Sequence, residues 1–279
     1  MTAPFRCAVD SSGRPDDLAG TASTVRAFLL VEEPGPWGVD ALTDSRLIVG
    51  TALRDAARAA RVRPLLIRRE GRSTVESGRR VFAAYADPVR PWLETTVVER
   101  VEDLLDLDLA SLGRGESPGL TPTDTPVLAV CTHGRHDTCC AERGRPVAVA
   151  LAAADPDRTW ECSHIGGDRF AGNIVILPDS LYFGRCAPES GVGVIEAYDR
   201  GDLDLAHYRG RSTLSFMHQA AEFFARRESS ASAIDAVTAV RRVGDAADGD
   251  IDVDIAGSGT VRVTVRRSTL DAPSALTCT

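Results

Sequence analysis

Short apolar runs separated by an amphipathic segment restrict the fold of this chain more than any other feature. The runs at 25–31, 63–68 and 81–85 have the length and content of buried strands. The segment 47–60 carries alanine and arginine on its outer face, which is typical of an amphipathic helix. Strand, helix and strand at this spacing form a βαβ unit. The first part of the chain is therefore predicted to be an α/β domain.

A second α/β pattern follows a stretch rich in Gly and Pro at 112–125, which is the clearest candidate for a linker. Its predicted order is strand, helix, strand, two-stranded hairpin and short helix, at 126–131, 140–153, 159–164, 174–177 with 181–186, and 192–200. This order is thioredoxin-like in outline. We predict an α/β protein of two α/β domains, at 1–115 and 122–228.

Residues 229–279 are predicted to form a C-terminal extension of a helix and a β-hairpin. A helix at 212–227 precedes it, and 231–243 is predicted to be a further helix. The segments 251–255 and 260–265 alternate polar and apolar residues around Gly257, Ser258 and Gly259. That alternation around a glycine-rich turn predicts the hairpin.

Charge and hydropathy exclude two classes of partner. The net charge of −8 argues against a nucleic-acid binder, which usually carries a basic surface. The longest apolar run, near 147–154, is far shorter than the roughly 18 residues needed to span a bilayer. The N-terminal residues lack the apolar core of a signal peptide. These features predict a cytoplasmic protein without nucleic-acid or membrane partners.

The seven cysteines favour metal or redox chemistry over a disulfide framework, because their number is odd and the predicted compartment is reducing. Cys131 ends a predicted strand, and Cys140 opens the following helix, where the helix dipole favours a thiolate. Cys162 and His164 are two residues apart on a strand, so their side chains point to one face. We predict that these four side chains surround one metal centre. Cys7, Cys186 and Cys278 are interpreted as small buried hydrophobic residues.

Spacing favours an iron–sulfur cluster over structural zinc. Zinc sites commonly contain two close cysteine pairs, whereas Cys131 and Cys140 are nine residues apart. Gly166 and Gly167 could bring backbone N–H groups close to a cluster sulfide. Arg169 is interpreted either as a further hydrogen-bond donor near the cluster or as an exposed loop arginine.

The motif Cys-Thr-His-Gly-Arg-His-Asp-Thr-Cys-Cys at 131–140, with Ser-His-Ile-Gly-Gly-Asp at 163–168, resembles the sucrase/ferredoxin-like family. The resemblance covers roughly residues 5–210, and Pro-Gly-Pro-Trp-Gly at 34–38 belongs to it. It implies that the second domain is a thioredoxin-like ferredoxin fold with a 2Fe–2S cluster. In fungal relatives two Cys and two His hold the cluster, the latter as His-Ile-Gly-Gly-His.

By position, the resemblance assigns Cys131, Cys140 and His164 as three ligands, and the fourth falls on Asp168, where the fungal pattern has His. Cys162 is preferred as the fourth ligand because carboxylate oxygen is uncommon on a soft cluster. Asp168 and Cys139 remain alternatives.

The function expected from this site is that of an iron–sulfur electron-transfer protein with an unidentified redox partner protein. Two alternatives stay open. One is a thiol oxidoreductase that uses Cys131, Cys139 or Cys140, although the expected C-x-x-C is missing. The other is a partner-binding protein with structural zinc.

Overall fold

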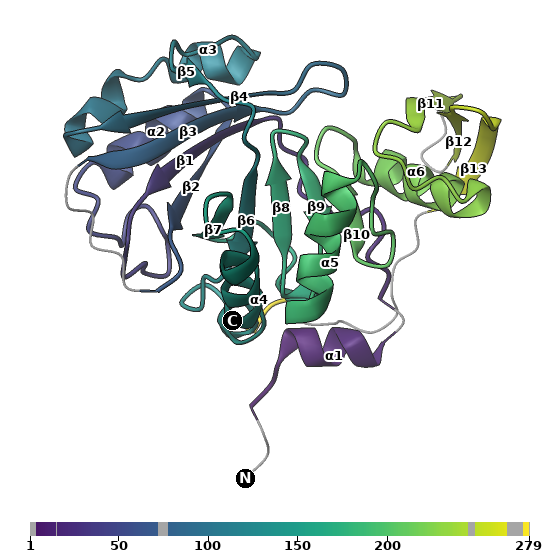
Figure 1. The fold of residues 1–279 in the computed structure, drawn as a ribbon, viewed down its shortest axis with the longest axis horizontal. Helices are drawn as coiled ribbons and strands as arrows, with labels where there is room; N and C mark the ends of the chain where they lie inside the picture. Colours follow the sequence, from purple (N-terminus) through teal and green to yellow (C-terminus); the bar gives the residue numbers. More distant parts are fainter. Residues whose placement is uncertain (1–3, 15, 72–77, 245–248, 267–275, 279) are drawn as a thin grey trace.

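The structure is a computed structural model that describes residues 4–14, 16–71, 78–244, 249–266 and 276–278. Ten strands form one mixed sheet in the order β10-β9-β8-β6-β7-β2-β1-β3-β4-β5 (Figure 1). They are β1 (Ala27–Glu32), β2 (Val62–Arg68), β3 (Arg79–Tyr85), β4 (Trp92–Val98), β5 (Thr121–Pro122), β6 (Val127–Cys131), β7 (Thr159–Cys162), β8 (Ile174–Leu177), β9 (Leu181–Phe183) and β10 (Tyr208–Arg211). The predicted α/β class is therefore confirmed.

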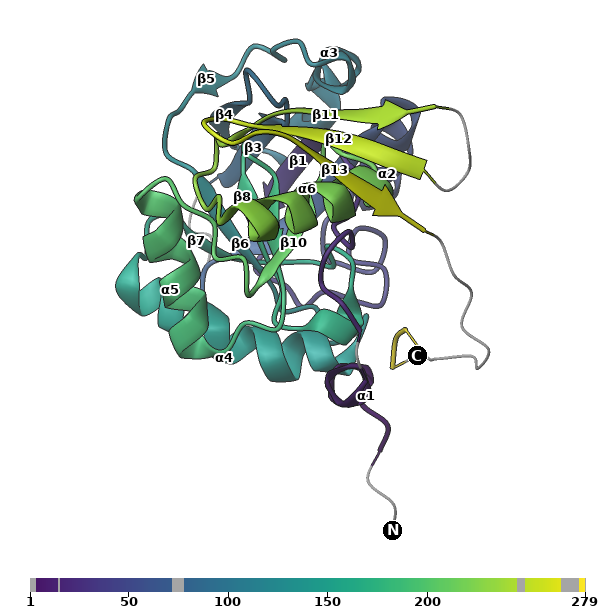
Figure 2. The ribbon, with the colours of Figure 1, turned by 90° about the vertical axis from the view of Figure 1, so that its right-hand side faces the viewer.

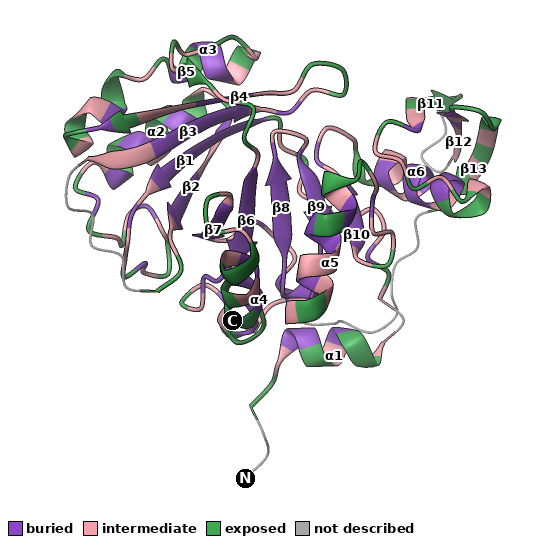
Figure 3. Cartoon of the chain, in the orientation of Figure 1, coloured by how far each residue is buried: buried purple, intermediate pink, exposed green. Residues whose placement is uncertain are grey.

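Alternation of side chains across the strands explains why this sheet is covered on both faces. Leu29 and Val31 of β1 pack in one core with the helices α2 (Gly50–Ala59) and α3 (Leu109–Arg114). Phe28 and Leu30, on the opposite face, belong to a second core. Since both faces are buried, β1 is an uninterrupted apolar run, which is the pattern that predicted it (Figure 3).

The helices α4 (Thr138–Ala154) and α5 (Pro188–Asp199) lie side by side against the second half of the sheet (Figures 1 and 2). Val147 and Leu151 of α4 pack with Val194 of α5 over the strands β6, β8 and β9. The 3-10 helix η2 (Asp168–Phe170) and the N-terminal helix α1 (Cys7–Gly13) lie in this part, whereas the 3-10 helix η1 (Val101–Asp106) packs against α2 and β4. Among the described helices, none is both long and apolar enough to cross a membrane.

The two halves of the chain share the sheet and one core. β2 and β7 pair antiparallel, with Ile67 opposite Cys162 and Arg68 opposite Glu161. Phe82 of β3 meets the ring of Trp160 of β7 edge-on at 5.7 Å. The stretch predicted as a linker contains the end of α3 and β5, which pairs with β4. The domain boundaries at 115 and 122 stay a prediction.

The C-terminal unit corrects one predicted element. Residues 237–243, predicted to be helical, form the strand β11 (Val237–Val243). It pairs with β12 (Gly249–Ile255), which pairs with β13 (Gly259–Val265) as the predicted hairpin. This three-stranded sheet packs on α6 (Phe216–Ser229) through Ile251, Val253 and Ile255 (Figure 2). Pairing with β12 therefore overrides the helical interpretation.

Candidate functional site

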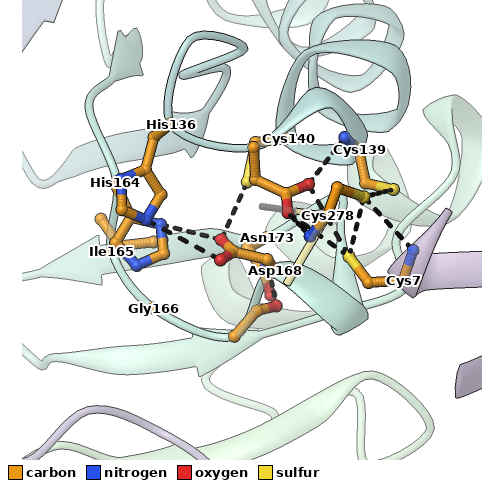
Figure 4. Close-up of polar contacts among 12 residues, drawn as sticks. Cys7, His136, Cys139, Cys140, His164, Ile165, Gly166, Asp168, Asn173 and Cys278 are labelled. Atoms are coloured by element: carbon orange, nitrogen blue, oxygen red, sulfur yellow. Dashed lines mark hydrogen bonds and ion pairs between the residues drawn. The ribbon is translucent and has the colours of Figure 1, made fainter. Parts of the chain in front are cut away.

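Three of the predicted ligands meet at one edge of the sheet, where β6 and β7 end. Cys131 lies opposite Cys162 in the parallel pairing of these strands. Cys140 comes from the first turn of α4, and His164 follows β7 (Figure 4). The ligand atoms of Cys131, Cys140 and His164 all lie within 4.8 Å of one another. Both cysteines are buried, and the His164 side chain is 24% exposed to solvent.

Asp168 joins this group from η2. Its Oδ1 lies 2.9 Å from His164 Nδ1 and accepts a hydrogen bond of 3.2 Å from the Cys140 thiol. His136 stacks on His164 with 3.8 Å between ring centroids, and its Nε2 lies 3.8 Å from Asp168 Oδ2. His136, His164 and Asp168 form a second combination, in which one possible ligand atom from each residue lies within 4.8 Å of the other two.

The two cysteines of the group differ in pKa. A hydrogen bond with the Cys140 side chain lowers the pKa of Cys131 well below its usual range despite burial. The same bond, burial and the Asp168 carboxylate raise the pKa of Cys140. We expected the helix dipole to make Cys140 the thiolate, but these neighbours outweigh it. Cys131 therefore has a lower pKa than Cys140.

His164 is polarised by the same neighbours. Burial opposes the charged imidazole, but the Asp168 carboxylate and the Cys131 thiolate outweigh it and raise the pKa of His164 to about 9. Burial also opposes the ionised form of Asp168, yet His164 and the Cys140 thiol lower its pKa overall. The group is therefore a compact set of interacting charges.

Cys162, the preferred fourth ligand, stands apart from this group. It is fully buried next to Cys131 on the neighbouring strand, and burial raises its pKa. Among the described residues, the group that brings Cys131, Cys140 and His164 together does not include it. The contacts of Asp168 place that carboxylate closer to the site than the sequence argument suggested. Cys139, the other alternative, belongs to a different cluster.

Gly166 and Gly167 shape the loop that carries His164 and Asp168. Both have positive φ values, 94° and 82°, which glycine adopts without strain. A Cβ on Gly167 would lie 2.2 Å from a nitrogen of Arg209. Their carbonyl groups accept hydrogen bonds from Arg209 and Asn173, at 3.0 and 2.9 Å. That the backbone N–H groups of Gly166 and Gly167 donate hydrogen bonds to a cofactor stays a prediction.

Arg169 faces a carboxylate outside the Cys/His group. Its Nε lies 3.6 Å from Asp16 Oδ2, and its guanidinium lies 4.4 Å from the centre of the Phe170 ring. Burial lowers its pKa. A role for Arg169 toward a cofactor stays a prediction.

Arg209 was not identified from the sequence, although it supports the whole loop. It is 1% exposed, and it donates to Gly166 O and to Asn173 Oδ1, at 3.0 and 2.8 Å. Burial lowers its pKa to about 10. It comes from β10, more than 40 residues after the loop, so no local pattern indicates the contact.

A shallow pocket of about 210 Å³ leads to the histidines of the site. Its wall combines residues 39–42, Arg63, Pro64, His133, His136, Ser163 and His164. His133 is buried and bonds to Gly38 O at 2.7 Å. Trp37 packs edge-on against His133, at 5.9 Å. The Pro-Gly-Pro-Trp-Gly motif of the first half therefore borders the site.

The sheet edge with its Cys and His side chains defines the class of this protein, an α/β protein with a candidate metal centre. The chain belongs to the sucrase/ferredoxin-like family, which matches residues 18–210. This confirms the family indicated by the sequence motifs.

Three curated fungal relatives are similar to the chain, and each is named altered inheritance of mitochondria protein 32. Those of Candida glabrata and Meyerozyma guilliermondii are both 31% identical, over 31% and 32% of this chain and 33% and 35% of their own lengths. The one of Debaryomyces hansenii is 25% identical over 46% of this chain and 47% of its own length. The chain thus spans between a third and a half of these relatives. No solved structure matches it.

These relatives correct the function expected from the sequence. Their name refers to mitochondrial inheritance and contains neither electron transport nor thiol oxidoreduction. The family match gives the name of the family and states no activity. The prediction of an iron–sulfur electron-transfer protein is therefore wrong, and the thiol oxidoreductase alternative is not supported either.

Proposed function

We propose that this chain is a metal-binding protein whose Cys131, Cys140 and His164 hold one thiophilic metal centre. The observation that carries the proposal is the mutual approach of their ligand atoms to within 4.8 Å. Ligands bound to one metal at 2.0–2.3 Å are about 3.3–3.8 Å apart, so small side-chain shifts suffice. Thiolate and imidazole together suit zinc, iron or copper.

The charges of the group support the same proposal. Two cysteine side chains and one carboxylate are buried at the end of a sheet, with a half-buried imidazole beside them. Burying negative charge is costly unless it is paired or bound to a metal. A bound cation would replace the proton of the Cys140 thiol, which is now donated to Asp168.

Asp168 has the geometry of a residue that orients a ligand. A metal-bound histidine usually donates its second ring N–H to a carboxylate, which fixes the orientation of the ring. His164 Nδ1 lies 2.9 Å from Asp168 Oδ1, so the carboxylate is close enough for such a contact after a small rotation of the ring. Asp168 would thus hold His164 in place, and the pocket beside His136 would give small ligands access to the centre.

Metal analysis of the purified full chain tests this proposal. We expect anaerobically purified protein to retain metal that the Cys140→Ala and His164→Ala variants lose. Cys186→Ala is the matched control, because the thiol of this buried cysteine donates to the carbonyl of Gly184, at 3.8 Å, and belongs to none of the ligand groups among the described residues. Since the His164 side chain is part-exposed, its replacement leaves the core intact. Equal metal content in folded wild type and His164→Ala protein would refute the proposal.

Four finer predictions belong with this proposal. A 2Fe–2S cluster as the bound centre requires acid-labile sulfide, which the same preparation would contain. A thioredoxin-like arrangement of residues 122–228 is supported by the order of β6, α4, β7, β8, β9 and α5. A cytoplasmic location and a protein partner stay predictions from the sequence.

A further inference from the structure

A second cysteine cluster lies on the other side of the first turn of α4. Cys278 Sγ is 3.4 Å from Cys139 Sγ and 3.4 Å from Cys7 Sγ. A ligand atom each of Cys7, Cys139, Cys278 and Asp137 lies within 4.8 Å of all the others (Figure 4). These residues come from α1, from the start of α4 and from the C-terminal segment. The interpretation of Cys7 and Cys278 as isolated hydrophobic residues overlooked this convergence.

Asp137 organises the cluster. Its carboxylate caps α4 by accepting a hydrogen bond of 2.8 Å from the Cys139 amide. The Cys278 amide donates to the other carboxylate oxygen at 2.6 Å, and Cys7 Sγ lies 3.6 and 3.7 Å from the two oxygens. The same carboxylate therefore positions the backbones of two cysteines and contacts the thiol of the third.

The burial of this carboxylate is the second observation that points to a ligand. Asp137 is 1% exposed, and Cys7 and Cys139 are equally inaccessible. Within the described part of the chain, no arginine or histidine lies within ion-pair distance of Asp137. The nearby Arg6 is paired with Glu142 at 2.7 Å. A buried carboxylate normally requires a cation, either a side chain or a metal.

We propose that Cys7, Cys139 and Cys278, with Asp137 as the fourth ligand, form a second metal site that binds a divalent thiophilic ion such as Zn²⁺. Tetrahedral zinc with Zn–S bonds of about 2.3 Å separates its sulfur ligands by about 3.8 Å. The observed 3.4 Å needs only a few tenths of an ångström of expansion. Binding releases the thiol protons to solvent, and no oxidant or reductant is involved.

The two sites share the first turn of α4 but use different side chains. Cys139 points to the second site and Cys140 to the first (Figure 4). A metal at the second site would fasten α1 and the segment 276–278 to the start of this helix. The inference is independent of the proposed function, because no residue belongs to both ligand sets.

Cobalt substitution in the full chain tests the second site. Metal-free reduced protein is titrated with Co²⁺ and then with Zn²⁺, and thiolate-to-cobalt absorption is recorded. We expect the Cys278→Ala variant to bind one ion fewer than wild type and to lose part of this absorption. Cys186→Ala should bind as many ions as wild type. Cys140→Ala should keep the absorption that Cys278→Ala loses.

Cys278 is a suitable target because it lies outside every helix and strand, so its replacement leaves the fold intact. Equal cobalt binding by folded Cys278→Ala and wild-type protein would overturn the proposal. A disulfide between Cys278 and Cys7 or Cys139 in freshly purified protein, found by mass spectrometry after thiol alkylation, would overturn it as well.

Discussion

Single buried polar side chains hold the loop of the candidate metal centre, and Arg209 is the most connected of them. Besides Gly166 and Asn173 it donates to Thr21 Oγ1 at 3.1 Å, so it joins the loop to the segment before β1. A buried acceptor that loses its donor costs about 1–3 kcal/mol. The position of His164 and Asp168 therefore depends on a residue that contacts neither of them.

Replacing Arg209 by Met should lower the free energy of unfolding by about 3 kcal/mol or more, because several buried acceptors lose their donor at once. Urea denaturation measures this change. Arg200→Met, at an exposed position, should stay within about 0.5 kcal/mol of wild type. A folded Arg209→Met protein of wild-type stability would show that the loop does not depend on this side chain.

The residues of the first site could be predicted because they stand in two short motifs at the ends of strands. Cys131, Cys140 and His164 lie within 34 positions of the sequence, and strand order alone brings them to one edge. Cys7 and Cys278 could not be paired in this way, since 271 positions separate them. Their contact depends on where the two ends of the chain pack, which no local pattern specifies.

At the scale of elements, the approach of α4 to β6 sets the distance between Cys140 and Cys131. Gly144 faces the carbonyl group of Cys131, and a Cβ at Gly144 would lie 2.0 Å from that oxygen. Only glycine permits this close packing of helix on strand. The helix cannot come as near with any larger residue at this position.

The variant Gly144→Ala should therefore lose about 1–3 kcal/mol of stability, as overpacked cores do, and bind metal at the first site more weakly. Gly193→Ala in α5 is the matched control, because a Cβ there meets nothing within 4 Å. Alanine favours helix over glycine by up to about 1 kcal/mol, so the control should be as stable as wild type or more so. Chemical denaturation compares the two, and equal stabilities would contradict the packing argument.

Ion pairs connect the C-terminal end of α4 with the C-terminal end of α5. Arg158 donates to both carboxylate oxygens of Asp199, at 2.7 and 2.8 Å, and it also contacts Asp155. Burial opposes the ionised form of Asp155, but the amide and the guanidinium of Arg158 outweigh it and lower the pKa of this carboxyl. The folded state therefore prefers the ionised form of Asp155.

The contribution of ionised Asp155 to the free energy of unfolding therefore depends on pH. The contribution of Asp155 is fully present above the unfolded pKa of about 3.9 and disappears as the pH falls through the lower folded value. Asp155→Asn should cost less than about 1 kcal/mol near pH 7, since the pair is part-exposed. Urea unfolding from pH 7 to 3 measures the difference, which should shrink only below about pH 4. Asp157→Asn, exposed in the same turn, should show no such trend.

Prediction of the elements succeeded where burial imposed a pattern and failed where it did not. The runs that became β1, β6 and β8 are buried on both faces, so their sequences are continuously apolar. β11 is mostly exposed, and its sequence Val-Thr-Ala-Val-Arg-Arg-Val fits a helix or a strand equally well. Its conformation depends on the antiparallel partner β12, which the local sequence does not indicate.

At the scale of the whole molecule, the two halves of the chain share one sheet and one core. The core that contains Phe28, Leu65 and Phe82 from the first half also contains Trp160 and Tyr182 from the second. Cys131, Cys140 and Cys162 lie in this same core. The candidate metal centre therefore sits at the margin of the contact between the halves, and its stability depends on both.

Removing the Phe82 ring should destabilise both halves together. Phe82→Ala leaves a cavity against Trp160, which should cost about 3 kcal/mol or more. If the halves unfold cooperatively, hydrogen exchange of the amides in β3 and in β8 will accelerate by the same factor. Phe216→Ala, at a position 55% exposed, should leave both strands protected as in wild type. Faster exchange in β3 with unchanged protection in β8 would show that the halves unfold separately, despite their shared sheet.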